Sequence, residues 1–343
     1  MNDIGIGVVG LGRLGYVHAS NVAKLPSARL SAVCDVDESL AQSTAKAIGC
    51  KWYTNVKDMV NDTDIDAVCV VTPTAYHLEP VSVVAQSGKP LFLEKPLAAS
   101  LSESKKVMEI IQQSGIKCQI GFQRRFDPDY AKARQMIHEG AIGKPVYING
   151  YARDPFPPPP WAMDPTKGGG LYIDMLLHDF DIARFLMNDE VVLVNADESN
   201  LVVDGQGVTR FADNVIVNLR FANGALATYH ASMHAEYGYD VRTEVYGSNG
   251  NLIIGGLHGT EVTLCSKHMG ITKPHTFQQQ GQQPHFMLRF REAYENEIEE
   301  FVRAVLDDTP VKVDARDAMQ AFKIALAATE AGAEKTGVSP DKY

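Results

Sequence analysis

Short apolar runs alternate with amphipathic segments over the first third of the chain. The runs are rich in β-branched residues and cover positions 4–10, 30–35, 67–71, 90–94 and 117–121. After the first run, Leu14, Val17 and Val22 form a rough apolar stripe at helical spacing, and Pro26 prevents its continuation. Strands that alternate with helices in this way are typical of a parallel sheet wrapped by helices, so we predict a doubly wound α/β domain.

The pattern changes beyond Asp127, where strands come to dominate. The dipeptides Asn223-Gly224 and Asn249-Gly250 each separate two runs with strand character, which is a strong hairpin signal. We therefore predict a second, α+β domain with a large, open, mostly antiparallel sheet and helices on one face. An open sheet needs its other face covered, and self-association is one solution. The helices and the first strand expected in this domain, including two helices that close it, cover 129–138, 144–152, 171–187, 286–306 and 315–335.

The first apolar run leads into a glycine-rich turn at residues 10–15, and a helical pattern follows it. Gly10 allows a tight turn, Gly12 lets the backbone approach a pyrophosphate, and Gly15 lets the helix pack against the strand. The helix, which begins near Arg13 and Leu14, then points its N-terminus at the phosphates. The motif predicts a dinucleotide site in a Rossmann domain. The alternative is a glycine-rich turn in an unrelated α/β protein, which the surrounding strand and helix disfavour.

Asp35 ends the second apolar run, about 20 residues after the glycines, where the dinucleotide fingerprint expects an acid. Its carboxylate can accept hydrogen bonds from both hydroxyls of an adenosine ribose. A 2′-phosphate at this position would meet a like charge. We therefore predict NAD rather than NADP as the cofactor.

Two further sets of residues follow the ends of predicted strands, where ligands of doubly wound sheets lie. The loop that begins at Thr72-Pro73 could carry the ribose or pyrophosphate of the cofactor, or it could only start the helix that contains His77. Glu94-Lys95-Pro96 places an ammonium group at a strand end, where it could donate to a substrate hydroxyl and stabilise the alkoxide. The alternatives are a solvated lysine and a pair between Lys95 and Glu94.

Paired arginines leave the last run of the first domain in the sequence Gln123-Arg124-Arg125. We expect one of them to line the site and the other to form a surface ion pair. Farther on, Arg153-Asp154-Pro155 opens a proline-rich segment that ends at Trp161 and predicts polyproline II structure. A rigid loop beside the substrate cleft is favoured over an SH3-type ligand.

Asp174 and His178 lie four residues apart in a predicted helix and so share one helical face. Histidine suits a general base because its ordinary pKa lies nearest neutrality, and a neighbouring carboxylate can orient it. An ordinary intrahelical pair and a metal site both stay open as interpretations. No further ligands at recognisable spacing accompany the pair, so we expect no metal.

The composition restricts the kinds of molecule that this protein is expected to bind. A formal net charge of −10 without a block of basic residues offers no electrostatic footprint for nucleic acid or acidic lipid and suits a small neutral substrate. No stretch reaches membrane-spanning length, and the first residues lack the pattern of a secretion signal. Five scattered cysteines fit free thiols in a reducing compartment, so we expect a cytoplasmic protein.

In order and context, the glycine turn, Thr72-Pro73, Glu94-Lys95-Pro96 and Asp174-x-x-x-His178 resemble the Gfo/Idh/MocA oxidoreductase family over nearly the whole chain. Residues 153–155, the glycine run 168–170 and the segment 174–181 are similar to inositol dehydrogenases. The resemblance implies an NAD-binding Rossmann domain over 1–122 and a substrate-binding and oligomerisation domain over 123–343. Subunits of the family pair through the open sheet, commonly as tetramers.

The resemblance also implies roles for individual residues. Lys95, Asp174 and His178 match the catalytic set of the family. The implied cofactor contacts are Gly10, Gly12, Arg13, Leu14, Asp35, Thr72, Pro73, His77, Glu94, Lys95 and Gln123. The implied substrate contacts are Lys95, Arg125, Arg153, Asp174, His178 and Tyr237. The segment 157–161 exceeds what many relatives carry.

The expected reaction oxidises a ring secondary alcohol of scyllo- or myo-inositol to the inosose, with hydride transfer to NAD. His178 would act as general base, Asp174 would orient it, and Lys95 would make the hydroxyl more acidic. An aldose 1-dehydrogenase acting on a glucose-type pyranose, including L-glucose, is the competing activity within the enzyme class. A non-catalytic NAD or sugar sensor and a glycosidase that works by transient oxidation also stay open, because fold alone does not exclude them.

Overall fold

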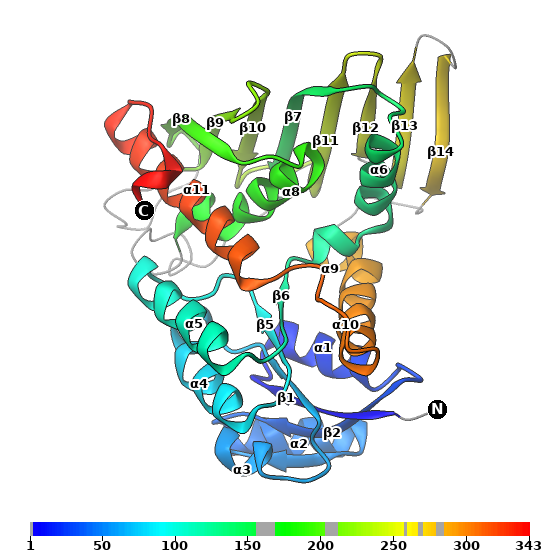
Figure 1. Ribbon diagram of the computed structural model, residues 1–343, viewed down its shortest axis with the longest axis vertical. Coiled ribbons are helices and arrows are strands. Elements are labelled where there is room, and N and C mark those ends of the chain that lie inside the picture. Colours follow the sequence, from blue (N-terminus) through cyan, green and yellow to red (C-terminus); the bar gives the residue numbers. More distant parts are fainter. Residues whose placement is uncertain (1–2, 156–168, 203–211, 257–258, 267–269, 279–284) are drawn as a thin grey trace. The chain divides into compact units, whose positions relative to one another are not determined.

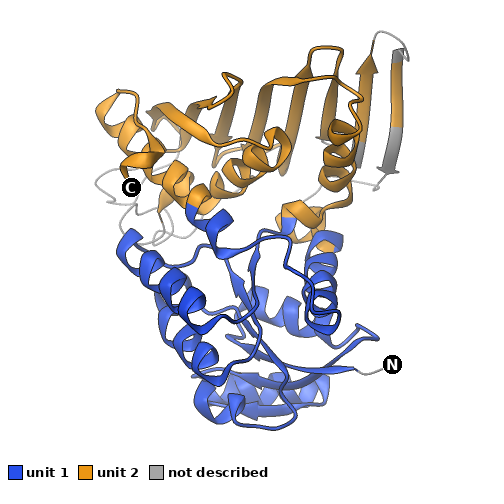
Figure 2. Ribbon diagram, viewed as in Figure 1, with its two compact units in different colours: residues 1–123, 292–319 blue, residues 124–291, 320–343 orange. Residues whose placement is uncertain are grey.

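The computed structural model describes residues 3–155, 169–202, 212–256, 259–266, 270–278 and 285–343. They form two compact units, coloured separately in Figure 2. The first unit consists of Met1–Gln123 and Glu292–Met319, and the second of Arg124–Arg291 and Gln320–Tyr343. The proline-rich stretch 157–161 and the predicted polyproline II structure lie outside the described residues.

The first unit contains a six-stranded parallel sheet in the order β3-β2-β1-β4-β5-β6 (Figure 1). This is the strand order of a Rossmann fold, and it reverses direction between β1 and β4, where such sheets bind their ligand. The strands are β1 Ile4–Val9, β2 Ala28–Cys34, β3 Lys51–Tyr53, β4 Ala67–Val70, β5 Leu91–Glu94 and β6 Cys118–Gly121. Its helices are α1 Arg13–Val22, α2 Glu38–Ile48, α3 Val56–Val60, α4 Leu78–Ser87 and α5 Leu101–Ser114. The predicted doubly wound domain is confirmed.

A late helix, α10 (Arg291–Leu306), also belongs to the first unit almost entirely. Its Ile298, Phe301 and Val302 are fully buried in the same apolar cluster as Val8 of β1 and Phe92 of β5. The expectation that this helix closes the second domain is therefore wrong. Helical periodicity shows that a stripe is buried, but it carries no information on which sheet the stripe covers.

The second unit contains an eight-stranded sheet in the order β14-β13-β12-β11-β7-β10-β9-β8. All of its pairs are antiparallel except β7 with β10. Its strands are β7 Pro145–Arg153, β8 Val191–Ser199, β9 Asn214–Phe221, β10 Leu226–Ser232, β11 Asp240–Gly247, β12 Gly250–Gly256, β13 Gly259–Ser266 and β14 Gly270–Gln278. The predicted open, mostly antiparallel sheet and both hairpins, β9–β10 and β11–β12, are confirmed.

Helices cover one face of this sheet. Figure 1 shows α6 (Pro128–His138) and α8 (Leu177–Met187) on the same side of it. Along β9, buried Val215, Val217 and Leu219 alternate with side chains that point to the other face, of which Ile216 is exposed. The remaining helices are α9 Phe286–Arg289 and α11 Ala315–Glu334. Among the described residues, none of the helices has the length and apolar character that a membrane crossing requires.

Candidate cofactor and substrate sites

The glycine turn connects β1 to α1 and leaves room for a ligand. Gly10 has a φ of +88°, and a Cβ there would lie 2.7 Å from the backbone nitrogen of Thr72. At Gly12, in contrast, a Cβ would meet no described heavy atom within 4 Å. Gly12 caps α1 and has no side chain to cover the N-terminus of the helix, whose first turn begins with Arg13 and Leu14. The turn therefore fits a pyrophosphate.

The Asp35 carboxylate is held beside this turn by backbone groups. The Leu11 N–H donates to Asp35 Oδ2 over 2.7 Å, and the Asp37 N–H donates to Oδ1 over 3.0 Å. Each carboxylate oxygen has a second lone pair, so both can still accept from ribose hydroxyls. The residues present thus fit the adenosine half of NAD, and the negative charge disfavours a 2′-phosphate.

His77 ties together two of the loops that follow strand ends. Its Nε2 lies 3.0 Å from the carbonyl oxygen of Thr72, and its Nδ1 lies 2.9 Å from that of Pro96. The residue is 1% exposed, and burial lowers the pKa of its imidazole. Because both ring nitrogens face backbone carbonyls, the side chain positions the Thr72-Pro73 loop and the loop after Lys95. A contact between His77 and the cofactor stays a prediction.

Glu94 and Gln123 also direct their side chains into the first unit. The Glu94 carboxylate accepts from the Lys95 backbone N–H over 3.1 Å and lies 2.8 Å from His18 Nε2. Gln123 Nε2 donates to the Tyr294 hydroxyl over 3.1 Å. Contacts of Glu94 and Gln123 with the dinucleotide stay predictions. Lys95 itself is half-buried at the end of β5.

In the second unit, Asp174 lies in a π-helical turn, Leu171–Met175, and His178 lies in the first turn of α8. The predicted helical stretch is present, but its first turn is π rather than α. Asp174 is exposed and His178 half-buried. A π turn rotates successive side chains by a smaller angle than an α turn, so the one-face pairing of Asp174 with His178 stays a prediction.

Two buried ion pairs fix α8 beside His178. Arg124 Nη1 lies 2.8 Å from Asp179 Oδ1, and Arg125 binds Asp181 through Nε over 2.8 Å and Nη2 over 2.6 Å. The expectation of a surface ion pair is wrong, because the side chains in both pairs are at most 10% exposed. The predicted contact between Arg125 and substrate stays a prediction, and its bidentate bond to Asp181 does not favour it.

The predicted substrate residues Arg153 and Tyr237 come together at the end of β7. Arg153 Nη1 donates to the Tyr237 hydroxyl over 2.9 Å, and Arg153 Nε donates to His230 Nδ1 over 3.0 Å. Asp240 is completely buried and accepts from the Tyr237 hydroxyl over 2.9 Å and from Arg242 over 2.7 and 3.0 Å. We call Arg153, His230, Tyr237, Asp240 and Arg242 the Arg153 cluster. Strand register through Tyr151 places His230, Arg242 and Ile216 on one face of the sheet, whereas Tyr229 packs against Phe180 of α8 on the other. A contact of Arg153 or Tyr237 with the substrate therefore stays a prediction.

Sequence reasoning missed the functional setting of His230, Asp240 and Arg242. These residues reach Arg153 only because β7 lies between β10 and β11, with Tyr151 opposite His230 and Arg153 opposite Asp240. Their separations along the chain from Arg153 are 77 residues for His230 and 87 for Asp240. The one signal in the sequence was Asp240, which starts a predicted strand three residues after the predicted substrate residue Tyr237.

Comparison with known proteins agrees with both halves of this description. Residues 4–122 match the model of the oxidoreductase family with an NAD-binding Rossmann fold. Residues 130–253 match the GFO/IDH/MocA C-terminal domain. The chain belongs to the Gfo/Idh/MocA oxidoreductase family. The expectation of an NAD-dependent oxidoreductase of this family is confirmed.

Relatives within the Gfo/Idh/MocA family align over almost their entire lengths. Scyllo-inositol 2-dehydrogenase (NAD(+)) of Bacillus subtilis (strain 168) is 38% identical over 327 residues, which is 94% of this chain and 92% of that protein. Myo-inositol 2-dehydrogenase of Thermotoga maritima is 35% identical over 335 residues, or 97% of each chain. The crystal structure of scyllo-inositol dehydrogenase from Lactobacillus casei with bound NAD(H) and scyllo-inositol has a TM-score of 0.86 at 31% identity, covering 99% of this chain and 100% of that one.

The structure therefore divides the candidate site residues of this Gfo/Idh/MocA chain into two groups. The glycine turn, Asp35, the Thr72-Pro73 loop and Lys95 lie at the carboxyl ends of strands in the first unit. Asp174, His178 and the Arg153 cluster lie in the second unit. The first group fits NAD by its backbone geometry, and the second supplies an imidazole and a hydrogen-bonding array.

Proposed function

We propose that this chain is an NAD-dependent inositol dehydrogenase that oxidises a ring secondary alcohol of scyllo- or myo-inositol to the inosose. The observation that carries the proposal is full-length similarity to relatives named as inositol dehydrogenases, together with the NAD-specific turn and Asp35. Residues 1–122 then bind NAD, and residues 123–343 bind the substrate and pair subunits.

The proposed roles follow from the chemistry of an alcohol, which is too weak an acid to lose its proton unaided. His178 takes the hydroxyl proton as general base, and Asp174 orients the imidazole and stabilises its charged form. Lys95 places a positive charge beside the same oxygen and lowers the pKa of the hydroxyl. Bound NAD supplies the nicotinamide that takes up the hydride.

Arg153 and Tyr237 are proposed to bind the remaining hydroxyls of the ring. The Tyr237 residue is 44% exposed although its hydroxyl is hydrogen-bonded to Arg153 and Asp240, so it can contact a ligand without leaving the Arg153 cluster. Arg125 belongs to the proposal only through the family resemblance, since its guanidinium is already bound to Asp181.

We further propose that the chain works in the cytoplasm as a homo-oligomer, a tetramer or a dimer. The support for self-association is the sheet face away from α6 and α8, which carries exposed Ile216, Leu226 and Tyr246. Apolar side chains on the uncovered face of a sheet are typical of a surface that pairs with another copy. Sedimentation velocity of the wild type and of Ile216→Glu tests this, because a monomeric wild type contradicts it.

The function is tested by mixing the purified protein with NAD, or separately with NADP, and a panel of scyllo-inositol, myo-inositol and both enantiomers of glucose. Absorbance of the reduced cofactor at mildly alkaline pH reports turnover. We expect reduction of NAD by an inositol. A preference for a glucose would instead favour the aldose 1-dehydrogenase, and no turnover despite NAD binding would favour a sensor or a transient-oxidation glycosidase.

A further inference from the structure

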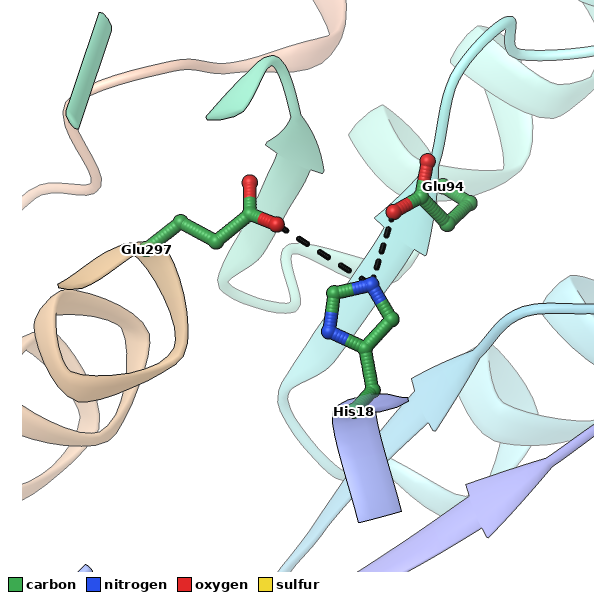
Figure 3. Close-up of side chains that lie close together, drawn as sticks. All are labelled: His18, Glu94 and Glu297. Atoms are coloured by element: carbon green, nitrogen blue, oxygen red, sulfur yellow. Dashed lines mark hydrogen bonds and ion pairs between the residues drawn. The ribbon is translucent and has the colours of Figure 1, made fainter. Parts of the chain in front are cut away.

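A buried cluster of titratable groups lies directly behind Lys95. Figure 3 shows His18 of α1, Glu94 at the end of β5 and Glu297 of α10 pointing toward one another. All three belong to the first unit, and their side chains are 0%, 7% and 0% exposed. We call these residues the His18 cluster. Nothing in the proposed reaction uses their charges.

Glu94 is the centre of the cluster and has a separate partner for each oxygen. Its Oε1 lies 2.8 Å from His18 Nε2, and its Oε2 accepts from the Lys95 backbone N–H over 3.1 Å. On the adjacent strand β6, a Cβ at Gly121 would lie 3.0 Å from the Glu94 carboxyl carbon, so the carboxylate is packed against bare backbone. Each oxygen of Glu94 thus lies within hydrogen-bond distance of one nitrogen, the Lys95 N–H being the backbone donor.

Glu297 completes the cluster as a fully buried acid. Its Oε1 lies 3.9 Å from His18 Nε2, which is too long for a hydrogen bond. Burial, and secondly the nearby Glu94, raise the pKa of Glu297 well above its ordinary value. The other titratable groups that face it are His18 on α1 and the Cys69 thiol on β4. Burial and a neighbouring carboxyl group both favour the protonated form of Glu297.

The same geometry argues against a metal ion shared by the three side chains. Tetrahedral ligands at about 2.0–2.1 Å from zinc lie roughly 3.3 Å from one another. The separations from His18 Nε2 are 2.8 Å to Glu94 and 3.9 Å to Glu297, one shorter and one longer than this spacing. The shorter distance is that of an N–H···O hydrogen bond.

Such a cluster is costly to keep in a protein core. Among the described residues, His18 Nδ1 and both Glu297 carboxyl oxygens have no hydrogen-bond partner. Unsatisfied buried polar groups destabilise a folded protein, and apolar replacements of such groups are often neutral or stabilising. The cluster therefore does not serve stability alone. One member of the cluster, Glu94, accepts a hydrogen bond from the backbone N–H of Lys95, and this bond connects the cluster to the candidate site.

We propose that His18 is a positioning residue that holds the Glu94 carboxylate, with Glu297 packed behind the imidazole as a second positioning residue, and that the carboxylate in turn sets the backbone and the side chain of Lys95. This inference rests on the proposed function of Lys95. It also links two parts of the first unit, because His18 belongs to the helix that starts at the dinucleotide turn. Movement of α1 on cofactor binding would thus reach Lys95 through one hydrogen-bonded carboxylate.

The test compares Glu94→Gln, His18→Leu, Glu297→Ala and Glu297→Gln with two controls. Val22→Ala on α1 and Val302→Ala on α10 remove completely buried packing from the same helices without touching Glu94. Because a 1 Å misplacement of a reacting group can cost about a hundredfold, we expect kcat to fall tenfold to hundredfold in Glu94→Gln and His18→Leu. The Kd for NAD should change by less than about threefold, and the controls should keep kcat within about threefold at temperatures where they are folded.

Glu297 gives the sharpest contrast. Gln resembles a protonated Glu in shape and charge, so Glu297→Gln should retain most of the activity that Glu297→Ala loses. Above the ordinary pKa of a glutamate, the unfolded chain releases a proton that folded Glu297 keeps, so the wild-type free energy of unfolding falls as pH rises. Glu297→Gln lacks this dependence. The Tm of Glu297→Gln minus the Tm of the wild type should therefore increase as the pH rises from 5 to 8.

A readout independent of turnover separates this inference from the proposed function. The rate at which acetic anhydride labels Lys95, relative to exposed Lys57, is measured by mass spectrometry without substrate. We expect the ratio to change in Glu94→Gln and His18→Leu and to stay constant in Val22→Ala. If no polyol is oxidised but the ratio still changes, the function fails and the positioning stands.

Three results would overturn the positioning. The first is a loss of kcat in the cluster variants no greater than in the controls. The second is a Lys95 labelling ratio equal to that of wild type in every variant. The third is a stoichiometric metal ion, found by elemental analysis in the wild type and missing from His18→Leu, which would replace the proton between His18 and Glu94 with a cation.

Discussion

The two units hold a carboxylate of their candidate sites in different ways. Asp35 is fixed by the backbone N–H groups of Leu11 and Asp37, which belong to its own turn or to the neighbouring glycine turn. Asp240 is fixed by the side chains of Tyr237, Arg242 and Arg153. A backbone-held group tolerates sequence change around it, whereas a side-chain network depends on each of its members. The cofactor half should therefore resist substitution better than the substrate half.

The largest effect is expected where the second unit supplies the proton acceptor. Positioned base catalysis contributes roughly 10²- to 10⁴-fold, so His178→Ala should lower kcat by that factor and leave the Kd for NAD within about twofold. His138→Ala, at the exposed end of α6, is the matched control and should behave as wild type. Steady-state kinetics with fluorescence titration of NAD measures both quantities. Turnover undiminished in His178→Ala would remove the base from the second unit.

The first unit could be predicted from the sequence because its signals are local. Each apolar run became a strand, and the glycine spacing located the turn within a few residues. Strand β3 was missed because three residues, two of them exposed, carry no periodic signal. His18 was missed because a single histidine on an amphipathic helix gives no sign that two distant carboxyl groups face it.

Prediction of the second unit was good for its hairpins and poor for its site. The Asn-Gly turns fixed the pairs β9–β10 and β11–β12 because a hairpin is set by adjacent residues. The parallel pairing of β10 with β7 joins strands far apart in the chain, and the Arg153 cluster depends on it. Register between distant strands is decided by packing of whole faces, which no short sequence window contains.

The side-chain network itself is tested next. In Asp240→Asn the two guanidinium groups of Arg153 and Arg242 lose their shared carboxylate, so Tyr237 and Arg153 should lose their fixed geometry. Breaking a buried charge pair costs about 2–5 kcal/mol, and we expect KM for the polyol to rise about 30-fold with an unchanged Kd for NAD. Glu244→Gln, on the same strand and bonded to Tyr246, is the control. An equal rise in both variants would contradict a specific role of the Arg153 cluster.

The corresponding change in the cofactor half should be smaller. Asp35→Asn keeps an oxygen for the Leu11 N–H but loses the charge that meets the ribose, so we expect NAD affinity to fall about tenfold. Discrimination against NADP should fall with it, because no negative charge then opposes a 2′-phosphate. Asp37→Asn, whose side chain caps α2, provides the control. Unchanged cofactor preference in Asp35→Asn would show that this carboxylate does not face the ribose.

The smallest effect concerns the pH dependence of the Arg153 cluster. Burial, and secondly the charge of Arg153, lower the pKa of His230, while Asp240 opposes them; neutral His230 accepts from Arg153 through Nδ1. The depressed pKa means that this contact is intact above the ordinary histidine pKa and is lost as pH falls through the lower folded value. KM for the polyol should then rise a few-fold as the pH falls from 7.5 to 5.5, as the charged ring repels Arg153.

The informative quantity is the ratio of KM in the wild type to KM in His230→Gln at each pH, because pH effects that both proteins share cancel in it. Glutamine can accept from Arg153 but cannot become charged, so the ratio should rise toward acid pH. The same measurement with His234→Gln should leave the ratio flat, because His234 lies two residues beyond the end of β10 and is more exposed than His230. A flat ratio for His230→Gln as well would mean that Asp240 and Tyr237 hold Arg153 without His230, and the network would then be as robust to acid as the backbone-held Asp35.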